Sequence, residues 1–270
     1  MQTHTGRYTE EMLAVGCGKV HLMKGGEGTP LLILQDDMGS PGWLPFYAEL
    51  ASSFTVYVPV HPGYGKSERP VWMRSVRDLA IAQNWLLKVL GLEALPVIGF
   101  GLGGWVAAEL ATMCHHRFTH MVLVGAVGVQ PLEGEIADQF LVSGEEYVKR
   151  CFHDPVQFEA LYGKETTVEQ REMWEVNREM TVRIAWKPYM FNHALPVLLG
   201  SVDTPTLVVW GHEDAVVPSS CAQRYVESLA RARLVVLDGC GHCAEAEKPQ
   251  ELAAIITDFI MGAGRRANGR

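Results

Sequence analysis

The sequence lacks the features that mark several classes of protein. No stretch approaches the roughly 18 consecutive apolar residues that a membrane span needs, and residues 1–24 contain no apolar segment typical of a secretory signal. Lys and Arg number 23 against 31 Asp and Glu, which gives a formal net charge of −8, and the basic residues are scattered. These absences predict a cytoplasmic protein with neither a membrane nor a nucleic acid as its partner.

Cysteine is too sparse to form the framework of the fold. The six cysteines are spread over 270 residues, so we expect free, buried thiols. Cys240-Gly241-His242-Cys243 spells C-x-x-C, and Cys114-His115-His116 is also metal-like in spelling. Neither has the context of a redox motif or the ligand spacing of a zinc site. The sequence therefore predicts neither a metal nor a cofactor.

Strand-like and helix-like segments alternate along most of the chain. Apolar or β-branched strands are predicted over residues 31–35, 54–60, 95–99, 121–124, 206–210 and 233–237, and helices over 43–52, 79–90, 106–111, 219–229 and 250–261. Ser75 and Asp78 have the spacing of a capping box before the second of these helices. Such alternation is typical of an α/β protein whose parallel sheet is covered by helices on both faces.

The pattern changes between residues 130 and 201. Helical periodicity, interrupted by Gly and Pro, predicts four or five short helices inserted between two strands. We therefore divide the chain into a core of residues 1–129 and 202–262, a helical lid of residues 130–201, and a flexible tail of residues 263–270.

The lid contains large apolar side chains that are candidates to line a pocket. The four candidates are Tyr147, Trp174, Trp186 and Met190. An aromatic lid over the ends of the strands is suited to a small, mostly apolar ligand. The alternative is that these side chains pack the lid on itself.

A hydroxyl is missing where the chain around it requires one. The strand at 95–99 runs into Gly99-Phe100-Gly101-Leu102-Gly103 and then into a helix. This is the form of a nucleophile elbow, G-x-S-x-G, in which the central serine is held at a strained turn. Gly101 stands at the serine position, so the flanking glycines are present and the nucleophile is absent.

Three further motifs accompany the elbow. His61-Pro62-Gly63-Tyr64-Gly65 is a glycine-rich turn after a strand, the segment 211–218 has the form G-x-x-D-x-x-x-P with Asp214, and the segment 239–242 has the form G-x-G-H with His242. With the elbow, they resemble the α/β-hydrolase superfamily over about residues 31–261. The resemblance implies an α/β-hydrolase fold, with a mostly parallel central sheet flanked by helices and an inserted helical lid. It also implies that Asp214 orients His242 as a catalytic dyad beside the vacant position of Gly101.

The chain departs from the family pattern at a second place, at the end of the strand predicted over residues 31–35. The family has a His-Gly motif there, and a backbone N–H of that motif helps to form the oxyanion hole. This chain has Gln35-Asp36-Asp37. A carboxylate beside a developing oxyanion opposes a stabilisation worth about 3–4 kcal/mol per donor. A serine hydrolase inactivated by a Ser-to-Gly change accounts for Gly101 alone, so the second change favours natural divergence.

The residues around the vacant position are candidates for an oxyanion or pocket region: Gln35, Asp36, Asp37, Phe100 and Leu102. We expect the Leu102 N–H to remain available as a donor. Of the two adjacent carboxylates, one is expected to face the crevice and the other to cap a neighbouring helix or meet solvent. A carboxylate in the crevice would disfavour anionic substrates and raise the pKa of His242.

Two functions from different classes follow from these residues. The first is a hydrolase or lyase-like enzyme for a small apolar carbonyl compound, of the ester or C–C type, in which His242 activates a water lodged in the space of the missing hydroxyl. The second is a binding protein for a small hydrophobic ligand, in which the His–Asp pair is a relic that braces two loops. The sequence leaves a homodimer open.

A dinucleotide-binding motif is a weaker interpretation of the same glycines. Gly99, Gly101 and Gly104 fit G-x-G-x-x-G between a strand and a helix. The next strand should then end in an acidic residue that binds the ribose, but residues 121–130 contain no Asp or Glu. The elbow is therefore the better interpretation.

Overall fold

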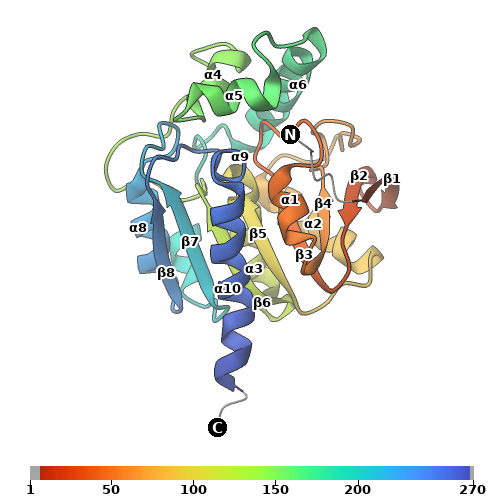
Figure 1. Ribbon diagram of the computed structural model, residues 1–270, viewed down its shortest axis with the longest axis vertical. Helices are drawn as coiled ribbons and strands as arrows, with labels where there is room; N and C mark the ends of the chain where they lie inside the picture. Colours follow the sequence, from red (N-terminus) through yellow and green to blue (C-terminus); the bar gives the residue numbers. More distant parts are fainter. Residues whose placement is uncertain (1–6, 268–270) are drawn as a thin grey trace.

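A single twisted sheet organises the chain in the computed structural model, which describes residues 7–267, with side chains as far as Gly262. Eight strands lie in the order β1-β2-β4-β3-β5-β6-β7-β8 (Figure 1). The strands are β1 (Tyr8–Val15), β2 (Gly18–Gly25), β3 (Thr29–Leu34), β4 (Phe54–Pro59), β5 (Leu95–Phe100), β6 (Phe118–Val124), β7 (Thr206–Gly211) and β8 (Ala232–Leu237). β1 and β2 pair antiparallel with each other, as do β2 and β4, and the remaining pairs are parallel. The parallel part of the sheet is the one that the sequence predicts.

The hairpin of β1 and β2 was not predicted. β1 is the edge strand, and only Val15 at its end is buried. A strand without a buried face shows little alternation of apolar and polar residues, so the signal on which the prediction depends is weak there. The hairpin extends the sheet and, as described below, lines one side of the cavity beside Asp36.

Apolar residues cover both faces of the sheet because successive strand residues point to opposite sides. In β3, Leu32 and Leu34 belong to one buried cluster and Leu31 and Ile33 to the other. The first cluster includes side chains of α2 (Val76–Val89), α3 (Gly101–Cys114) and α8 (Ser219–Ser228), and the second includes those of α1 (Pro45–Leu50) and α10 (Pro249–Ala267). The predicted capping box of Ser75 and Asp78 is formed at the start of α2.

Four helices lie in the segment that connects β6 to β7. They are α4 (Gly144–Arg150), α5 (Pro155–Tyr162), α6 (Val168–Ala185) and α7 (Leu195–Leu199). In Figure 1, α4, α5 and α6 project above the sheet as a separate layer. Hydrogen bonds from this segment reach the loop after β3, because Asn177 Nδ2 donates to Met38 O and Gln139 Nε2 donates to Asp37 Oδ2. The inserted segment therefore contacts the carboxyl ends of the parallel strands.

The last helix is longer than the sequence predicts. α10 continues to Ala267, whereas the expected helix ends at Met261 and the expected tail begins at residue 263. The alanines and arginines after Gly262 are good helix formers and outweigh the two glycines. Residues 268–270 of the expected tail lie outside the described residues.

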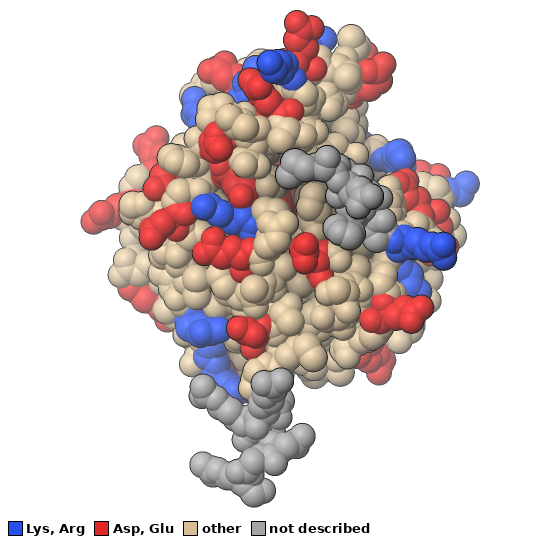
Figure 2. Space-filling view, in the orientation of Figure 1, with Lys and Arg blue, Asp and Glu red and all other residues tan. Residues whose placement is uncertain are grey.

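The distribution of surface charge and the length of the apolar helices bear on whether a nucleic acid or a membrane could be a partner. On the face drawn in Figure 2, basic and acidic side chains are interspersed over the same elements. Within residues 7–267, no helix is both long and apolar enough to cross a bilayer.

Candidate functional site

The turn from β5 into α3 forms the centre of the site. Gly101 is the first residue of α3 and has a φ of +47°, in the left-handed region that favours glycine. Gly103, the third residue of α3, lies so close to β3 that a Cβ there would overlap the backbone oxygen of Leu34. The flanking glycines of the elbow, Gly99 and Gly103, are therefore required by close approach of the backbone, independently of any nucleophile.

Asp214 and His242 meet across two loops that follow neighbouring strands. Asp214 follows β7 and His242 follows β8, and both side chains are almost completely buried. His242 Nδ1 lies 2.8 Å from Asp214 Oδ2, while Asp214 Oδ1 accepts hydrogen bonds from Val216 N (2.8 Å) and Val217 N (2.9 Å). The carboxylate is thus held by two backbone donors and fixes the orientation of the imidazole ring.

Asp36 occupies the space beside Gly101. Its Oδ1 accepts a hydrogen bond of 2.8 Å from Leu102 N, and its Oδ2 lies 3.4 Å from His242 Nε2. A Cβ built on Gly101 would overlap this carboxylate. Two expectations are corrected as a result: the room left by the missing hydroxyl holds Asp36 instead of a water, and the Leu102 N–H already has an acceptor.

His242 therefore lies between two carboxylates. Burial opposes the charged imidazolium, but the charges and hydrogen bonds of Asp214 and Asp36 outweigh burial and raise the pKa of His242 well above its usual value. Burial acts to raise the pKa of Asp36, but the hydrogen bond and charge of His242, with the N–H groups of Leu102 and Asp37, lower it overall. Both directions favour a proton on His242 and a negative charge on Asp36, in agreement with an imidazole ring that lies between two carboxylates.

Asp37 points into the inserted segment, and the expectation that it caps a helix or meets solvent is wrong. Its side chain is buried, and Oδ2 accepts hydrogen bonds from Gln139 Nε2 (2.8 Å) and Thr181 Oγ1 (3.2 Å). Burial and the neighbouring charge of Asp36 raise its pKa to about 7. Asp37 lies in a turn closed by a hydrogen bond from Gly39 N to Asp36 O, and its carboxylate contacts the inserted segment, whereas that of Asp36 reaches His242.

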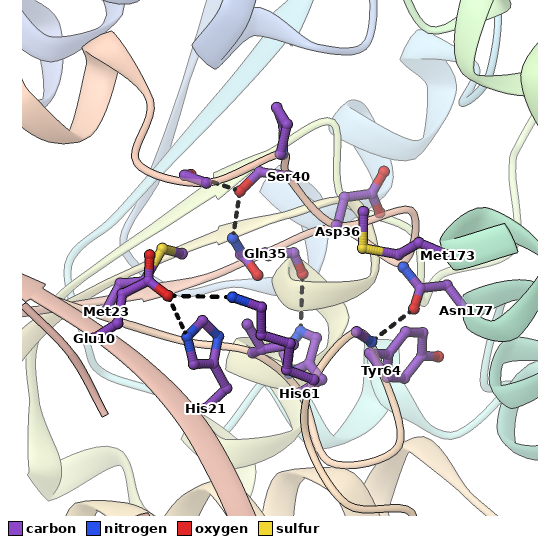
Figure 3. A pocket seen from close by; sticks show the side chains of 16 residues that line it. Glu10, His21, Met23, Gln35, Asp36, Ser40, His61, Tyr64, Met173 and Asn177 are labelled. Carbon is purple, nitrogen blue, oxygen red and sulfur yellow. Dashed lines mark hydrogen bonds and ion pairs between the residues drawn. The ribbon is translucent and has the colours of Figure 1, made fainter. Parts of the chain in front are cut away.

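Of the other predicted oxyanion or pocket residues, Gln35 lines the cavity described below, whereas the Phe100 and Leu102 side chains do not. The Gln35 side chain donates to Ser40 Oγ at 2.8 Å, so it braces its own loop (Figure 3). Phe100 is buried against Phe46, with ring centroids 5.6 Å apart. Phe100 ends a strand whose side chains alternate between the two faces of the sheet, and its ring falls on the face away from the site. Leu102 contributes its backbone N–H, while its side chain is in the core.

His61 is a structural histidine of the same region. Its Nε2 lies 2.8 Å from Gln35 O, which can only accept, so this nitrogen carries the proton. Nδ1 lies 2.9 Å from Gln83 Nε2 and accepts from it. Burial lowers the pKa of His61 to about 4 and keeps the ring neutral, against the opposing effects of the Gln35 carbonyl and the Asp36 charge.

A cavity of about 150 Å³ lies next to Asp36. Its lining combines the loops after β3 and β4 with the β1–β2 hairpin and α6, and includes Glu10, His21, Met23, Gly39, Ser40, Val60, Tyr64, Lys66, Met173 and Asn177. Figure 3 shows Glu10, His21 and Met23 on one side and Tyr64 and Asn177 on the other, with the Asp36 carboxylate pointing away from Glu10 and His21. The sequence did not single out Glu10, His21 or Lys66, because the hairpin that carries the first two was missed.

The four lid residues expected in the pocket are not at this cavity. Within the described part of the chain, α6 lines it through Met173 and Asn177. Tyr147, Trp174 and Met190 are buried in the core cluster, whereas Trp186 is half exposed and lines a separate pocket together with Tyr189 and Phe191. Trp174 packs edge-on against Tyr162 with ring centroids 5.2 Å apart. Three of the four candidates are thus buried in packing, the alternative that the sequence left open, and the fourth lines a different pocket.

Two glutamates hold the loop of His242 and carry no motif by which the sequence could reveal them. Glu247 accepts from Gly241 N (2.6 Å) and, with its other oxygen, from Asp154 N (2.8 Å). Glu213 accepts from Cys240 N at 2.9 Å.

All six cysteines are free, including Cys240 and Cys243. Among the described residues, no group of three or more His, Cys, Asp or Glu side chains is arranged to hold a metal.

Comparisons with known proteins bear on the family and the fold of the chain. A family model described as the alpha/beta hydrolase family matches residues 37–255. A 2-hydroxy-6-oxo-6-phenylhexa-2,4-dienoate hydrolase of Comamonas testosteroni is 27% identical over 89% of this chain and 91% of its own length. A 2-hydroxymuconate semialdehyde hydrolase of Pseudomonas sp. (strain CF600) is 26% identical over 95% of each chain.

Solved structures give the same result for the fold. A 2-hydroxy-6-oxo-6-phenylhexa-2,4-dienoate hydrolase from Rhodococcus sp. strain RHA1 superposes with a TM-score of 0.79 over 95% of this chain and 100% of its own, at 22% identity. A membrane phospholipase A superposes with a TM-score of 0.81 over 94% of this chain and 86% of its own, at 21% identity. At these identities the superpositions show a shared fold only.

Proposed function

The chain belongs to the alpha/beta hydrolase family, and on that premise we propose that it acts on a small, mostly apolar carbonyl compound through His242, Asp214 and water, without a serine nucleophile. The observation that carries the proposal is the buried imidazole held by Asp214 at 2.8 Å, with its other nitrogen 3.4 Å from Asp36. A hydrogen-bonded His–carboxylate pair at the carboxyl ends of parallel strands is equipped for proton transfer.

In the proposed reaction Asp36 is the base and His242 is the acid, and the substrate carbonyl and a water take the place of their direct contact of 3.4 Å. The Asp36 carboxylate takes a proton from water as the water oxygen bonds to the carbonyl carbon, and His242 Nε2 gives its proton to the carbonyl oxygen. The product of this step is a gem-diol. Neutral His242 then takes a proton from a diol hydroxyl, and protonated Asp36 gives its proton to the leaving carbon or oxygen as that bond breaks. The site ends as it began, with Asp36 charged and His242 protonated.

The named substrates of the relatives fit chemistry of the C–C type. A 2-hydroxy-6-oxo-6-phenylhexa-2,4-dienoate has a ketone and no ester or amide, so its hydrolysis at the ketone breaks a C–C bond. We extend the reaction class, ester or C–C type, to this chain and derive the residues from its own site. A serine hydrolase with only Ser-to-Gly changed is a poorer account, because a side chain at position 101 and the Asp36 carboxylate need the same space.

The test of the proposal compares turnover in matched histidine variants. We expect slow hydrolysis of a chromogenic short-chain ester or an aryl ketone, abolished in His242→Ala and retained in His116→Ala, which replaces an exposed histidine of η1 (His115–Arg117). A serine-directed fluorophosphonate should leave the protein unlabelled. Equal rates in the two variants, or labelling that accounts for the turnover, would contradict the proposal.

One observation favours a second candidate, a non-catalytic protein that binds a small hydrophobic ligand. Asp36 already accepts the hydrogen bond of Leu102 N, the donor that would stabilise an oxyanion. The inserted segment would then act as a lid over a binding cavity. Ligand binding that survives in His242→Ala, with no turnover in the parent protein, would favour this candidate over the enzyme.

A further inference from the structure

The donors that a bound anion would use are already satisfied from within the chain. Two donors converge on one position. One is the N–H of Leu102 in the first turn of the 14-residue helix α3, and the other is Nε2 of His242. A helix N-terminus and an imidazolium together attract a carboxylate or an oxyanion. The carboxylate at that position is Asp36, which lies 2.8 Å from Leu102 N and 3.4 Å from His242 Nε2. The side chain thus acts as a built-in ligand of its own anion site.

The surroundings supply little positive charge for a second carboxylate. Asp37 and Asp214 add acidic groups within the same cluster of loops. Among the described residues that line the cavity, Lys66 is the one Lys or Arg, and its ammonium is paired with Glu10 at 3.3 Å. His61 is buried and neutral. The single imidazolium of His242 is therefore shared by carboxylates that the chain already carries.

We propose that Asp36 determines specificity by excluding carboxylates, so that the cavity takes a neutral carbonyl compound such as an aryl ketone. A neutral ketone can occupy the cavity beside Asp36 without needing the Leu102 N–H or His242, whereas a carboxylate must compete with Asp36 for these donors. This substrate class differs from that of the relatives, whose names give dienoates, which are anions. The proposal deepens the proposed function and rests on it only in taking the cavity beside Asp36 as the ligand site.

The test measures binding of two ligands of similar size, acetophenone and benzoate, by calorimetry at neutral pH. We expect the parent protein to bind acetophenone at least about tenfold more tightly than benzoate. In Asp36→Gly, the Leu102 N–H and His242 become free, so benzoate should bind at least about tenfold more tightly than it does to the parent. Asp36→Asn keeps the shape of the side chain and an acceptor for Leu102, and it should relieve only the charge repulsion.

The matched control is Asp258→Asn, which removes one negative charge from an exposed position of α10, away from the site. It should leave both affinities unchanged. Benzoate binding by Asp36→Gly alone, without detectable binding of either ligand to the parent, also supports the proposal. An unchanged ratio of affinities in Asp36→Gly, or benzoate binding to neither protein, overturns it. Because binding is measured without turnover, failure of the proposed catalysis leaves this result intact.

Discussion

At the residue scale, the Asp36 carboxylate and a side chain at position 101 cannot occupy the site together. The Asp36 carboxylate lies where a Cβ on residue 101 would be, and its position is fixed by Leu102 N and His242. The absence of a side chain at position 101 is therefore a packing requirement as much as the loss of a nucleophile. The motif reveals the missing serine, but it does not reveal what fills the space.

Restoring the serine alone should damage the protein. We expect Gly101→Ser to lower the free energy of unfolding by about 1–3 kcal/mol, because the new side chain displaces Asp36, and to add no esterase activity. Gly101→Ser with Asp36→Gly should recover stability and hydrolyse p-nitrophenyl acetate above background, since the hydroxyl then has His242 as its base. Urea unfolding and initial rates check both variants. If Gly101→Ser alone were as stable as the parent, Asp36 would have to move aside without lowering the free energy of unfolding.

The charge on His242 should appear in the dependence of stability on pH. Its pKa is raised well above 6.5 in the folded protein, so its contribution to stability is fully present below the unfolded value of 6.5 and is lost as pH rises through the folded value. Asp36→Asn removes one of the two carboxylates and should move that loss to lower pH. Unfolding measured between about pH 5 and pH 10, with NMR titration of the His242 ring, tests this expectation. Titration near 6.5 in the parent protein would be inconsistent with an imidazolium between two carboxylates.

At the scale of elements, the loop after β3 is the joint between the sheet and the inserted segment. Asp37 receives hydrogen bonds from Gln139 and from Thr181 on α6, and Thr181 Oγ1 also lies 3.0 Å from Tyr64 OH. Asn177 on the same helix donates to Met38 O and accepts from Gly65 N. One face of α6 thus holds two core loops that flank the cavity.

Asp37 should make this joint weaker as pH rises. Burial raises its pKa to about 7, so the protonated form is favoured in the folded protein, and this stabilisation is present at acid pH and lost as pH rises through about 7. Asp37→Asn does not ionise, so its stability relative to the parent should improve by about 1–3 kcal/mol between acid and alkaline pH. Urea unfolding at several pH values measures the difference.

Thr181→Val provides the matched control for Asp37→Asn. It removes hydrogen bonds at the same joint without changing a charge, and it should cost about 1 kcal/mol with little dependence on pH. Parallel pH profiles for the two variants would contradict a role for the ionisation of Asp37.

At the scale of the whole molecule, the inserted segment shares its apolar core with the sheet. Phe152, Trp174 and Met180 belong to the same buried cluster as the strand residues Leu32 and Leu34. We expect that replacing residues 131–201 with a short Gly-Ser linker leaves a folded sheet with exposed apolar surface, seen as strong binding of a hydrophobic dye. A variant without a cooperative unfolding transition would assign the segment to the main core instead of a lid.

The sequence predicts most of this molecule where local patterns carry the information. The central parallel strands are nearly continuous apolar runs, and the elbow and the loops of Asp214 and His242 have motifs at fixed spacing, so the parallel sheet and the candidate dyad follow from the sequence. The edge strand β1 does not follow, because its side chains are exposed. Nor does the contact of Asp36 with Leu102, which joins residues 66 positions apart through the packing of one loop on a helix.

The overlap between position 101 and Asp36 also restricts how this chain can change over generations. A serine that reappears at the elbow meets a carboxylate in its own space, so reversion in one step produces a less stable protein with no restored activity. Asp36 must be replaced first, and that step leaves Leu102 and His242 without the partner they now share. Which side chains are tolerated at position 101 therefore depends on the residue at position 36, and the reverse is also true.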